Sequence, residues 1–230
     1  MKMNSKNILV VAAHPDDEIL GCGGTIAKLS QKNDVFVIIL GEGITSRDMP
    51  DNKKIEGLSN LKNEMSAANN ILGTKQIFTE DLPDNKFDTV PLLDIIKIIE
   101  AYIQKINPEV VYTHHRGDLN IDHRITFDAV LTACRPVEGN PVKKLLSFEV
   151  PSSTEWNIQG ASTNFNPNVY EDISGTIDKK TEAMSAYKNE IRLSPHPRSM
   201  KKIRSLGETR GAASGMNFAE AFMLIRELRV

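Results

Sequence analysis

Two short polar clusters contain the residue types that bind metal ions and move protons. The first, directly after an apolar run, is Ala13-His14-Pro15-Asp16-Asp17-Glu18. The second is His114-His115-Arg116-Gly117-Asp118-Leu119-Asn120-Ile121-Asp122-His123, which places three of the chain's five histidines within ten residues. Adjacent carboxylates such as Asp16 and Asp17 repel each other unless a cation or a proton intervenes. A bound metal ion would resolve that conflict.

His14, Asp17 and His123 together offer two imidazoles and one carboxylate. This donor set, with one position left open for water, is typical of catalytic rather than structural zinc sites. Pro15 fixes its own backbone angle and restricts His14, which stiffens the loop that carries the first two ligands. The clusters therefore predict one zinc ion per chain.

The elements that must position these clusters alternate between strand-like and helix-like runs. Apolar runs predict strands at 8–13, 35–40, 77–78, 109–113 and 145–150, and helical spacing predicts helices at 19–29, 58–72, 90–106 and 125–133. This alternation predicts an α/β fold, with a Rossmann-like, mostly parallel sheet covered by helices on both faces. Such sheets place active sites at the carboxyl ends of their strands, and each polar cluster follows a predicted strand.

The second half of the chain is less regular but shows no linker, so a single domain over 1–230 is expected, with its core in 1–150. Residues 151–168 are rich in Ser, Asn, Thr and Pro and predict a long loop. Helices predicted at 177–191, 199–210 and 217–229 would form a C-terminal helical extension that completes the active site. His196 lies between Pro195 and Pro197, so it is rigidly presented and is a candidate for the wall of that site.

Composition excludes several classes of protein. The formal net charge is −2, which gives no electrostatic basis for a nucleic-acid or acidic-membrane partner. Cys22 and Cys134 form no CxxC pair, so a reducing cytoplasmic location is the expectation. No apolar run approaches the roughly 20 residues that span a bilayer.

The sequence AHPDDE, followed after a later strand by DxNxDH, resembles the LmbE and PIG-L family of zinc-dependent N-acetylglucosaminyl deacetylases. The resemblance covers most of the chain and includes a C-terminal stretch of the PHPRS…AEAF kind. It implies a Rossmann-like fold and a hydrolase that removes the N-acetyl group from an N-acetylglucosamine-type sugar or sugar conjugate, releasing acetate. It also implies that a homo-oligomer, a trimer or a hexamer, is possible.

The resemblance also implies a role for individual residues. His14, Asp17 and His123 would be the metal ligands, Asp16 the general base, and Asp122 a partner that orients a ligand or a catalytic group. Many members carry a histidine three residues before the last ligand, where this chain has Asn120. An asparagine can donate a hydrogen bond to an oxyanion but cannot act as a general acid.

The general acid is therefore open among Asp16 and three histidines, His114, His115 and His196, of which His196 is the preferred candidate. Arg47, in the segment after the second predicted strand, can bind sugar hydroxyls or a phosphate. The other candidate substrate contacts are His115 and Arg198.

Three other interpretations stay open. A magnesium-binding phosphate-acceptor domain also carries paired acidic residues after its first strand, and Asp81 could be its phosphorylated residue, but no lysine follows the fifth predicted strand. A dinucleotide-binding module would use the glycines of Gly21-Cys22-Gly23-Gly24, which do not match GxGxxG. A deacylase that acts on a non-sugar amide would use the same metal site.

Overall fold

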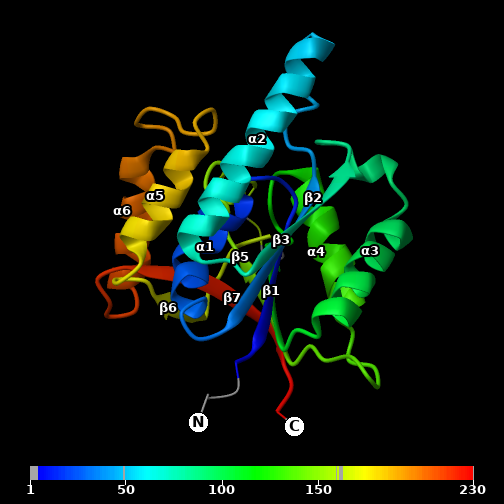
Figure 1. The fold of residues 1–230 in the computed structure, drawn as a ribbon. Coiled ribbons are helices and arrows are strands. Elements are labelled where there is room, and N and C mark those ends of the chain that lie inside the picture. Colours follow the sequence, from blue (N-terminus) through cyan, green and yellow to red (C-terminus); the bar gives the residue numbers. More distant parts are fainter. Residues whose placement is uncertain (1–4, 49, 159, 161–162, 230) are drawn as a thin grey trace.

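The computed structural model describes residues 5–48, 50–158, 160 and 163–229, which form a seven-stranded sheet between two layers of helices (Figure 1). The strands are β1 (Asn7–Ala12), β2 (Asp34–Gly41), β3 (Gln76–Leu82), β4 (Val110–His114), β5 (Lys144–Phe148), β6 (Val169–Asp172) and β7 (Ala219–Glu227). The helices are α1 (Asp17–Leu29), α2 (Asp51–Leu72), α3 (Leu92–Ile106), α4 (Ile121–Ala133), α5 (Ile177–Ala186) and α6 (Met200–Ala212).

The strand order is β3-β2-β1-β4-β5-β7-β6, and β1 to β5 pair in parallel. Alternate residues of β1 face opposite layers: Val10 packs in the core shared with α1, α2, α5 and α6, and Val11 packs in the core shared with α3 and α4. Because both faces of the sheet are covered, its central strands are apolar without alternation. The predicted α/β, mostly parallel architecture with helices on both faces is confirmed.

The C-terminal part departs from the predicted helical extension. The helix predicted at 217–229 is wrong, because these residues form β7, which pairs antiparallel with β5 and β6. Its sequence, AEAFMLIRE, contains good helix formers, and tertiary pairing overrides that preference. The four-residue β6 was not predicted, and α5 ends at Ala186 rather than at 191. The predicted loop over 151–168 contains one 3-10 turn, η2 (Thr154–Trp156), and its residues 159, 161 and 162 lie outside the described part.

Helix α1 is broken at Cys22, whose φ and ψ of −148° and 25° are not helical. An unbroken helix would join the backbone N–H of Gly24 to the carbonyl of Leu20 by a hydrogen bond. At this break, both groups instead bind buried side chains from other elements. Gly24 donates to Glu220 at 2.9 Å, and Lys180 Nζ donates to the Leu20 carbonyl at 2.9 Å and to Glu220 at 2.6 Å. The ion pair from α5 and β7 thus fixes the helix that follows the first polar cluster.

Replacing Lys180 by Met should lower the free energy of unfolding by about 3 kcal/mol or more, because Glu220 would keep a buried charge without its cation. Chemical denaturation of the variant measures this change. Lys179→Met is the matched control, since Lys179 is exposed on the same helix. Equal stability of the two variants would contradict a stabilising role for the buried pair.

The glycines near the start of α1 allow close packing between elements. A Cβ on Gly21 would lie 2.2 Å from the Phe148 ring, and one on Gly24 would lie 2.8 Å from Ile173. Packing therefore accounts for these glycines, which gave the dinucleotide-binding interpretation its basis.

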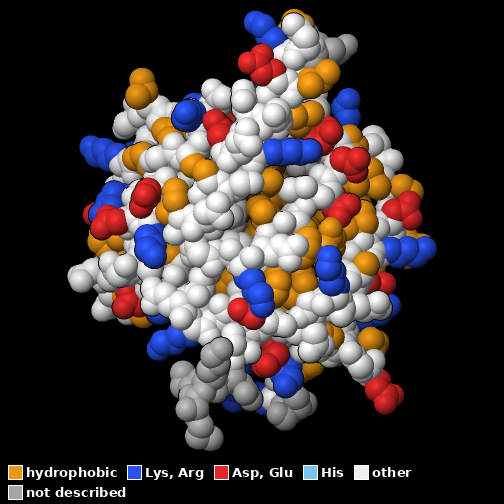
Figure 2. All heavy atoms as spheres, viewed as in Figure 1, with side chains coloured by type: hydrophobic (Ala, Val, Ile, Leu, Met, Phe, Trp, Pro, Cys, Tyr) orange, Lys and Arg blue, Asp and Glu red, His pale blue; other side chains and the backbone are white. Residues whose placement is uncertain are grey.

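Figure 2 shows Lys, Arg, Asp and Glu side chains interspersed over one face of the molecule, in keeping with the small net charge. Among the described residues, none of the helices has both the length and the apolar character needed to span a bilayer.

Candidate active site

Both polar clusters lie at the carboxyl edge of the sheet, where the strand order changes direction. The first cluster follows β1 and the second follows β4, and these two strands are neighbours in the sheet. The connections lead from β1 outward to β2 and β3 on one side, and from β4 to β5 on the other. Parallel sheets bind ligands at this kind of switch point, and the topology therefore brings together residues more than a hundred positions apart.

His14, Asp17 and His123 converge on one point. Asp17 Oδ2 lies 3.3 Å from His14 Nδ1 and 3.1 Å from His123 Nε2. One ligand atom from each of the three residues lies within 4.8 Å of the other two, and all three residues are buried. The predicted ligand set is therefore assembled in space.

Two further carboxylates face the outer nitrogens of the two imidazoles. His14 Nε2 lies 2.9 Å from Asp122 Oδ2, and His123 Nδ1 lies 3.1 Å from Asp118 Oδ1. Asp118 is itself held by the hydroxyls of Ser153 and Thr154. Carboxylates in this position fix the orientation of metal-binding imidazoles.

The three converging residues fit a divalent metal ion. Asp17 Oδ1 is buried and has no hydrogen-bond partner among the described residues. Burial alone would lower the pKa of His14, but its contacts with Asp122 and Asp17 raise it to about 10. Burial would raise the pKa of Asp17, but His123 holds it well below its usual range. The site thus favours a positive charge beside a carboxylate oxygen that has no partner. A bound metal ion would supply that charge.

Asp16 has a left-handed backbone, with φ 98°, which is uncommon for a residue other than glycine. Its backbone N–H donates to Glu18 Oε2 at 3.0 Å, and the other Glu18 oxygen accepts from Tyr187 and Asn69. Burial raises the pKa of Glu18 to about 7, against the hydrogen bonds from Tyr187 and Asn69. These contacts from α2 and the end of α5 hold Asp16 beside the ligands.

The Asp16 carboxylate accepts from Arg198 Nη1 at 2.7 Å. Burial raises the pKa of Asp16 well above its usual range, and Arg198 opposes that shift. A carboxylate with a raised pKa can take up a proton and return it near neutral pH. Arg198, expected to be a substrate contact, thus lies against the expected general base.

A cavity of about 190 Å³ opens in front of the three converging residues. It is lined by His14, Pro15, Asp16, Asp17, Gly43, Ser46, Arg47, Asp84, Asn85, Asn120, His123, Ser152, Ser153, Glu190 and Arg198. Asn120 caps α4 by accepting the N–H of Asp122, and its amide nitrogen donates to Asn85. Since an amide has two N–H groups, one donor of Asn120 is left for a ligand.

Three predicted site histidines do not line this cavity. His114 is buried and accepts the N–H of Ala13, and burial lowers its pKa well below the usual range. His115 Nε2 lies 3.1 Å from the Thr163 carbonyl. His196 accepts the N–H of Arg198, and its ring meets Trp156 edge-on at 5.7 Å.

The comparisons with known proteins agree with this geometry. A family model described as PIG-L, GlcNAc-PI de-N-acetylase, matches residues 9–134, more than half of the chain and all three converging residues. This chain belongs to the PIG-L family. The sequence resemblance to the LmbE and PIG-L family is therefore confirmed.

Two relatives and one solved structure extend the match beyond the PIG-L model. The uncharacterized deacetylase YaiS of Escherichia coli K12 is 30% identical over 174 residues, 73% of this chain and 82% of YaiS. A probable N-acetyl-α-D-glucosaminyl L-malate deacetylase 2 of Bacillus anthracis is 25% identical over 193 residues, 82% of this chain and 83% of the relative. The N,N'-diacetylchitobiose deacetylase of Pyrococcus horikoshii shares the fold, with a TM-score of 0.78 and 19% identity over 97% of this chain and 85% of that one.

Two residues that line the smaller cavity, Asp84 and Glu190, were not predicted from the sequence. Asp84 is buried, accepts from the backbone and hydroxyl of Ser46, and lies 3.4 Å from His14 Nε2. Asp84 follows β3. Residues that follow parallel strands lie at the carboxyl edge of the sheet, and this reasoning, which made Arg47 a candidate, applies equally to Asp84. Glu190 follows α5 in an irregular segment, and no pattern in the sequence marks it.

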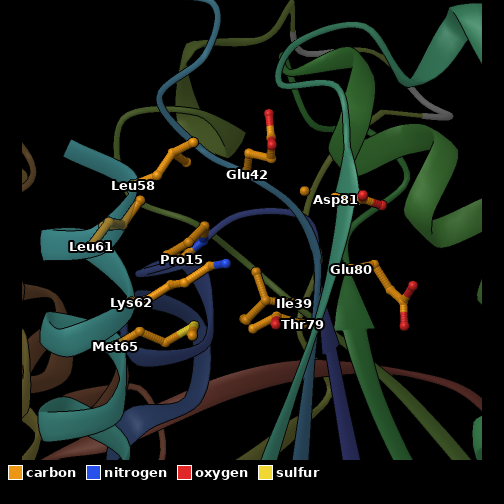
Figure 3. A pocket seen from close by; sticks show the side chains of 11 residues that line it. Pro15, Ile39, Glu42, Leu58, Leu61, Lys62, Met65, Thr79, Glu80 and Asp81 are labelled. Carbon is orange, nitrogen blue, oxygen red and sulfur yellow. The ribbon is translucent and has the colours of Figure 1, made fainter. Parts of the chain in front are cut away.

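A second, larger cavity of about 370 Å³ lies beyond Pro15, between α2 and the ends of β2 and β3 (Figure 3). Ile39, Leu61 and Met65 line its inner part, and Asp81 stands on the opposite wall. Asp81 is therefore not among the residues that line the smaller cavity, where Asp16 and Asp17 lie. A phosphate-acceptor site would need Asp16, Asp17 and Asp81 in one cavity. Their placement in different cavities disfavours the phosphate-acceptor interpretation.

Proposed function

We propose that this chain is a zinc-dependent hydrolase that removes the N-acetyl group from an N-acetylglucosamine-type sugar or sugar conjugate and releases acetate. The observation that carries the proposal is the convergence of His14, Asp17 and His123 beside Asp16, in a chain that belongs to the PIG-L family. The names of its relatives, which include deacetylases of N-acetylglucosaminyl malate and of diacetylchitobiose, support the reaction class.

His14, Asp17 and His123 would hold one zinc ion, since two imidazoles and one carboxylate form a catalytic zinc donor set. The ion would supply Lewis acidity to the acetamide carbonyl and to an attacking water molecule. Asp122 and Asp118 would keep the two imidazoles in the orientation that ligation needs.

Asp16 would act as the general base that takes a proton from the attacking water. Because His114, His115 and His196 do not line the cavity, Asp16 is also the best placed group to return that proton to the leaving amine. Asn120 would donate its free N–H to the developing oxyanion. Arg198 would hold the Asp16 carboxylate in position through their 2.7 Å contact.

The outer part of the cavity would bind sugar hydroxyls. Asp84 accepts hydrogen bonds, and Ser46 and Asn85 both donate and accept them. Arg47 would contribute from the segment after β2. This mixture of donors and acceptors favours a sugar over the open alternative, a non-sugar amide.

We further propose that residues 1–230 act as one domain in the cytoplasm. In support of one domain, β6 and β7 belong to the same sheet as β1 to β5. In support of a reducing location, both cysteines are free and buried. A trimer or hexamer stays a prediction, which light scattering of the purified protein tests.

The test of the function is acetate release from N-acetylglucosamine and N,N'-diacetylchitobiose, with the uncharged amide of an N-acetyl amino acid as the non-sugar comparison. We expect release from the sugars, loss of that release after chelation, and recovery when zinc is added back. Release from the amino acid amide alone would favour the non-sugar amidase. No release from any of the three by the zinc-loaded protein would contradict the proposal for these substrates.

A further inference from the structure

Glu190 stands between the two arginines that line the small cavity. Its Oε1 accepts from Arg47 Nη2 at 2.5 Å, and its Oε2 lies 3.7 Å from Arg198 Nη1. The Glu190 side chain is only 8% exposed, whereas Arg47 is 39% and Arg198 is 21% exposed, so the carboxylate is buried and the arginines partly face solvent. One carboxylate therefore faces both cations, and the exposed Arg192, which does not line the cavity, lies 4.0 Å from its Oε2.

Both arginines are already paired with a carboxylate, Arg47 through Nη2 and Arg198 through Nη1. Arg198 also pairs with Asp16 and donates from Nε to Ser152 Oγ at 2.8 Å. Among the described residues that line the cavity, these two arginines are the permanent cations, and four carboxylates line the same cavity, those of Asp16, Asp17, Asp84 and Glu190. A divalent ion bound by His14, Asp17 and His123 would bring the summed charge of these arginines and carboxylates close to zero. No excess positive charge would then remain to attract an anionic substrate.

Apart from the proposed ligands His14 and His123, the remaining polar side chains of the cavity are uncharged. They are the side chains of Ser46, Asn85, Asn120, Ser152 and Ser153. Hydroxyls and amides of this kind suit the hydroxyl groups of a sugar, and they compensate an ionised phosphate or carboxylate less well than a free arginine does.

We propose that Glu190 makes this site selective for N-acetylated sugars that carry no negative charge, by neutralising Arg47 and Arg198. This inference rests on the proposed deacetylase function and narrows its substrate class. An anionic substituent would approach a buried carboxylate, and it would gain Arg47 only by displacing Glu190 from it. An uncharged sugar meets no such repulsion.

The experiment compares two substrates with the same acetamide, methyl N-acetyl-α-glucosaminide and N-acetylglucosamine 1-phosphate. For the zinc-loaded wild type, we expect kcat/KM to be at least about tenfold higher for the uncharged glycoside, the scale of a single charge contact in a partly buried site. In Glu190→Gln, this preference should fall by about tenfold. Glu182→Gln, the same substitution at an exposed position of α5, should leave it unchanged.

Two outcomes would overturn the inference: a wild type that uses the phosphate as well as the glycoside, or a Glu190→Gln variant that keeps the full preference. Glu190→Ala, which removes the side-chain acceptor as well as the charge, serves as a second variant if the first does not fold. The wild-type comparison needs no variant. If the wild type releases acetate from neither sugar, the proposed function fails, rather than the selectivity assigned to Glu190.

Discussion

Replacing Asp16 by Asn should lower turnover by roughly 10²–10⁴-fold and leave the zinc content unchanged, as expected for a general base that does not ligate the metal. Asparagine has nearly the shape of aspartate and tolerates the left-handed backbone at φ 98°. The substitution therefore removes the proton acceptor without disturbing the loop. Turnover under saturating substrate and elemental analysis of the same preparation test the two parts.

Asp94→Asn is the matched control, since Asp94 is exposed at the start of α3. It should keep wild-type turnover. Loss of zinc from Asp16→Asn would show instead that Asp16 is a ligand. Near-normal turnover in that variant would move the base to another group.

The pH dependence gives Asp16 a second test. The base must be ionised, so activity should fall as the pH drops through the pKa of Asp16. Because burial raises that pKa well above the usual value of 3.8, the acid limb should lie at higher pH than for an ordinary aspartate. In Asp16→Asn, this limb should be absent from the residual activity. An unchanged acid limb would assign it to another group.

The sequence was sufficient for the parts of the fold that repeat a local pattern. The apolar runs of β1, β2 and β4 predicted buried parallel strands, and their carboxyl ends predicted where the two clusters meet. The strand β7 could not be predicted in this way, because AEAFMLIRE is rich in helix formers. Its conformation depends on pairing with β5, which lies about 75 positions earlier in the chain.

Within the site, motif spacing predicted which residues converge but not how they are held. The sequence shows Asp16 next to Asp17, but it does not show that Glu18 binds the Asp16 backbone or that Arg198 lies on its carboxylate. His196 was favoured because two prolines flank it, and rigid presentation says nothing of direction. The structure turns Arg198 into the cavity and places His196 against Trp156.

Replacing His123 by Ala should weaken zinc binding by more than about 100-fold, beyond what loss of an outer partner of a ligand costs. The reason is that His123 Nε2 is one of the three atoms that converge on the site. Competition with a zinc-buffering chelator measures the affinity. Asp118→Asn should give an intermediate loss of about 10–100-fold, because Asp118 lies against the other nitrogen of His123. His196→Ala should keep wild-type affinity.

A second group, formed by His14, Asp84 and Asp122, also has metal-ligand spacing, and the same assay separates the two. Asp122 is less suited to ligate an ion, because its two oxygens already accept the backbone N–H groups of Asn85 and Phe87. Asp17, in contrast, has one oxygen without a partner among the described residues. Asp84→Asn should therefore weaken zinc binding by no more than about 100-fold, since Asp84 is at most an outer partner. A wild-type affinity in His123→Ala, combined with loss of zinc from Asp84→Asn, would move the ion to the second group.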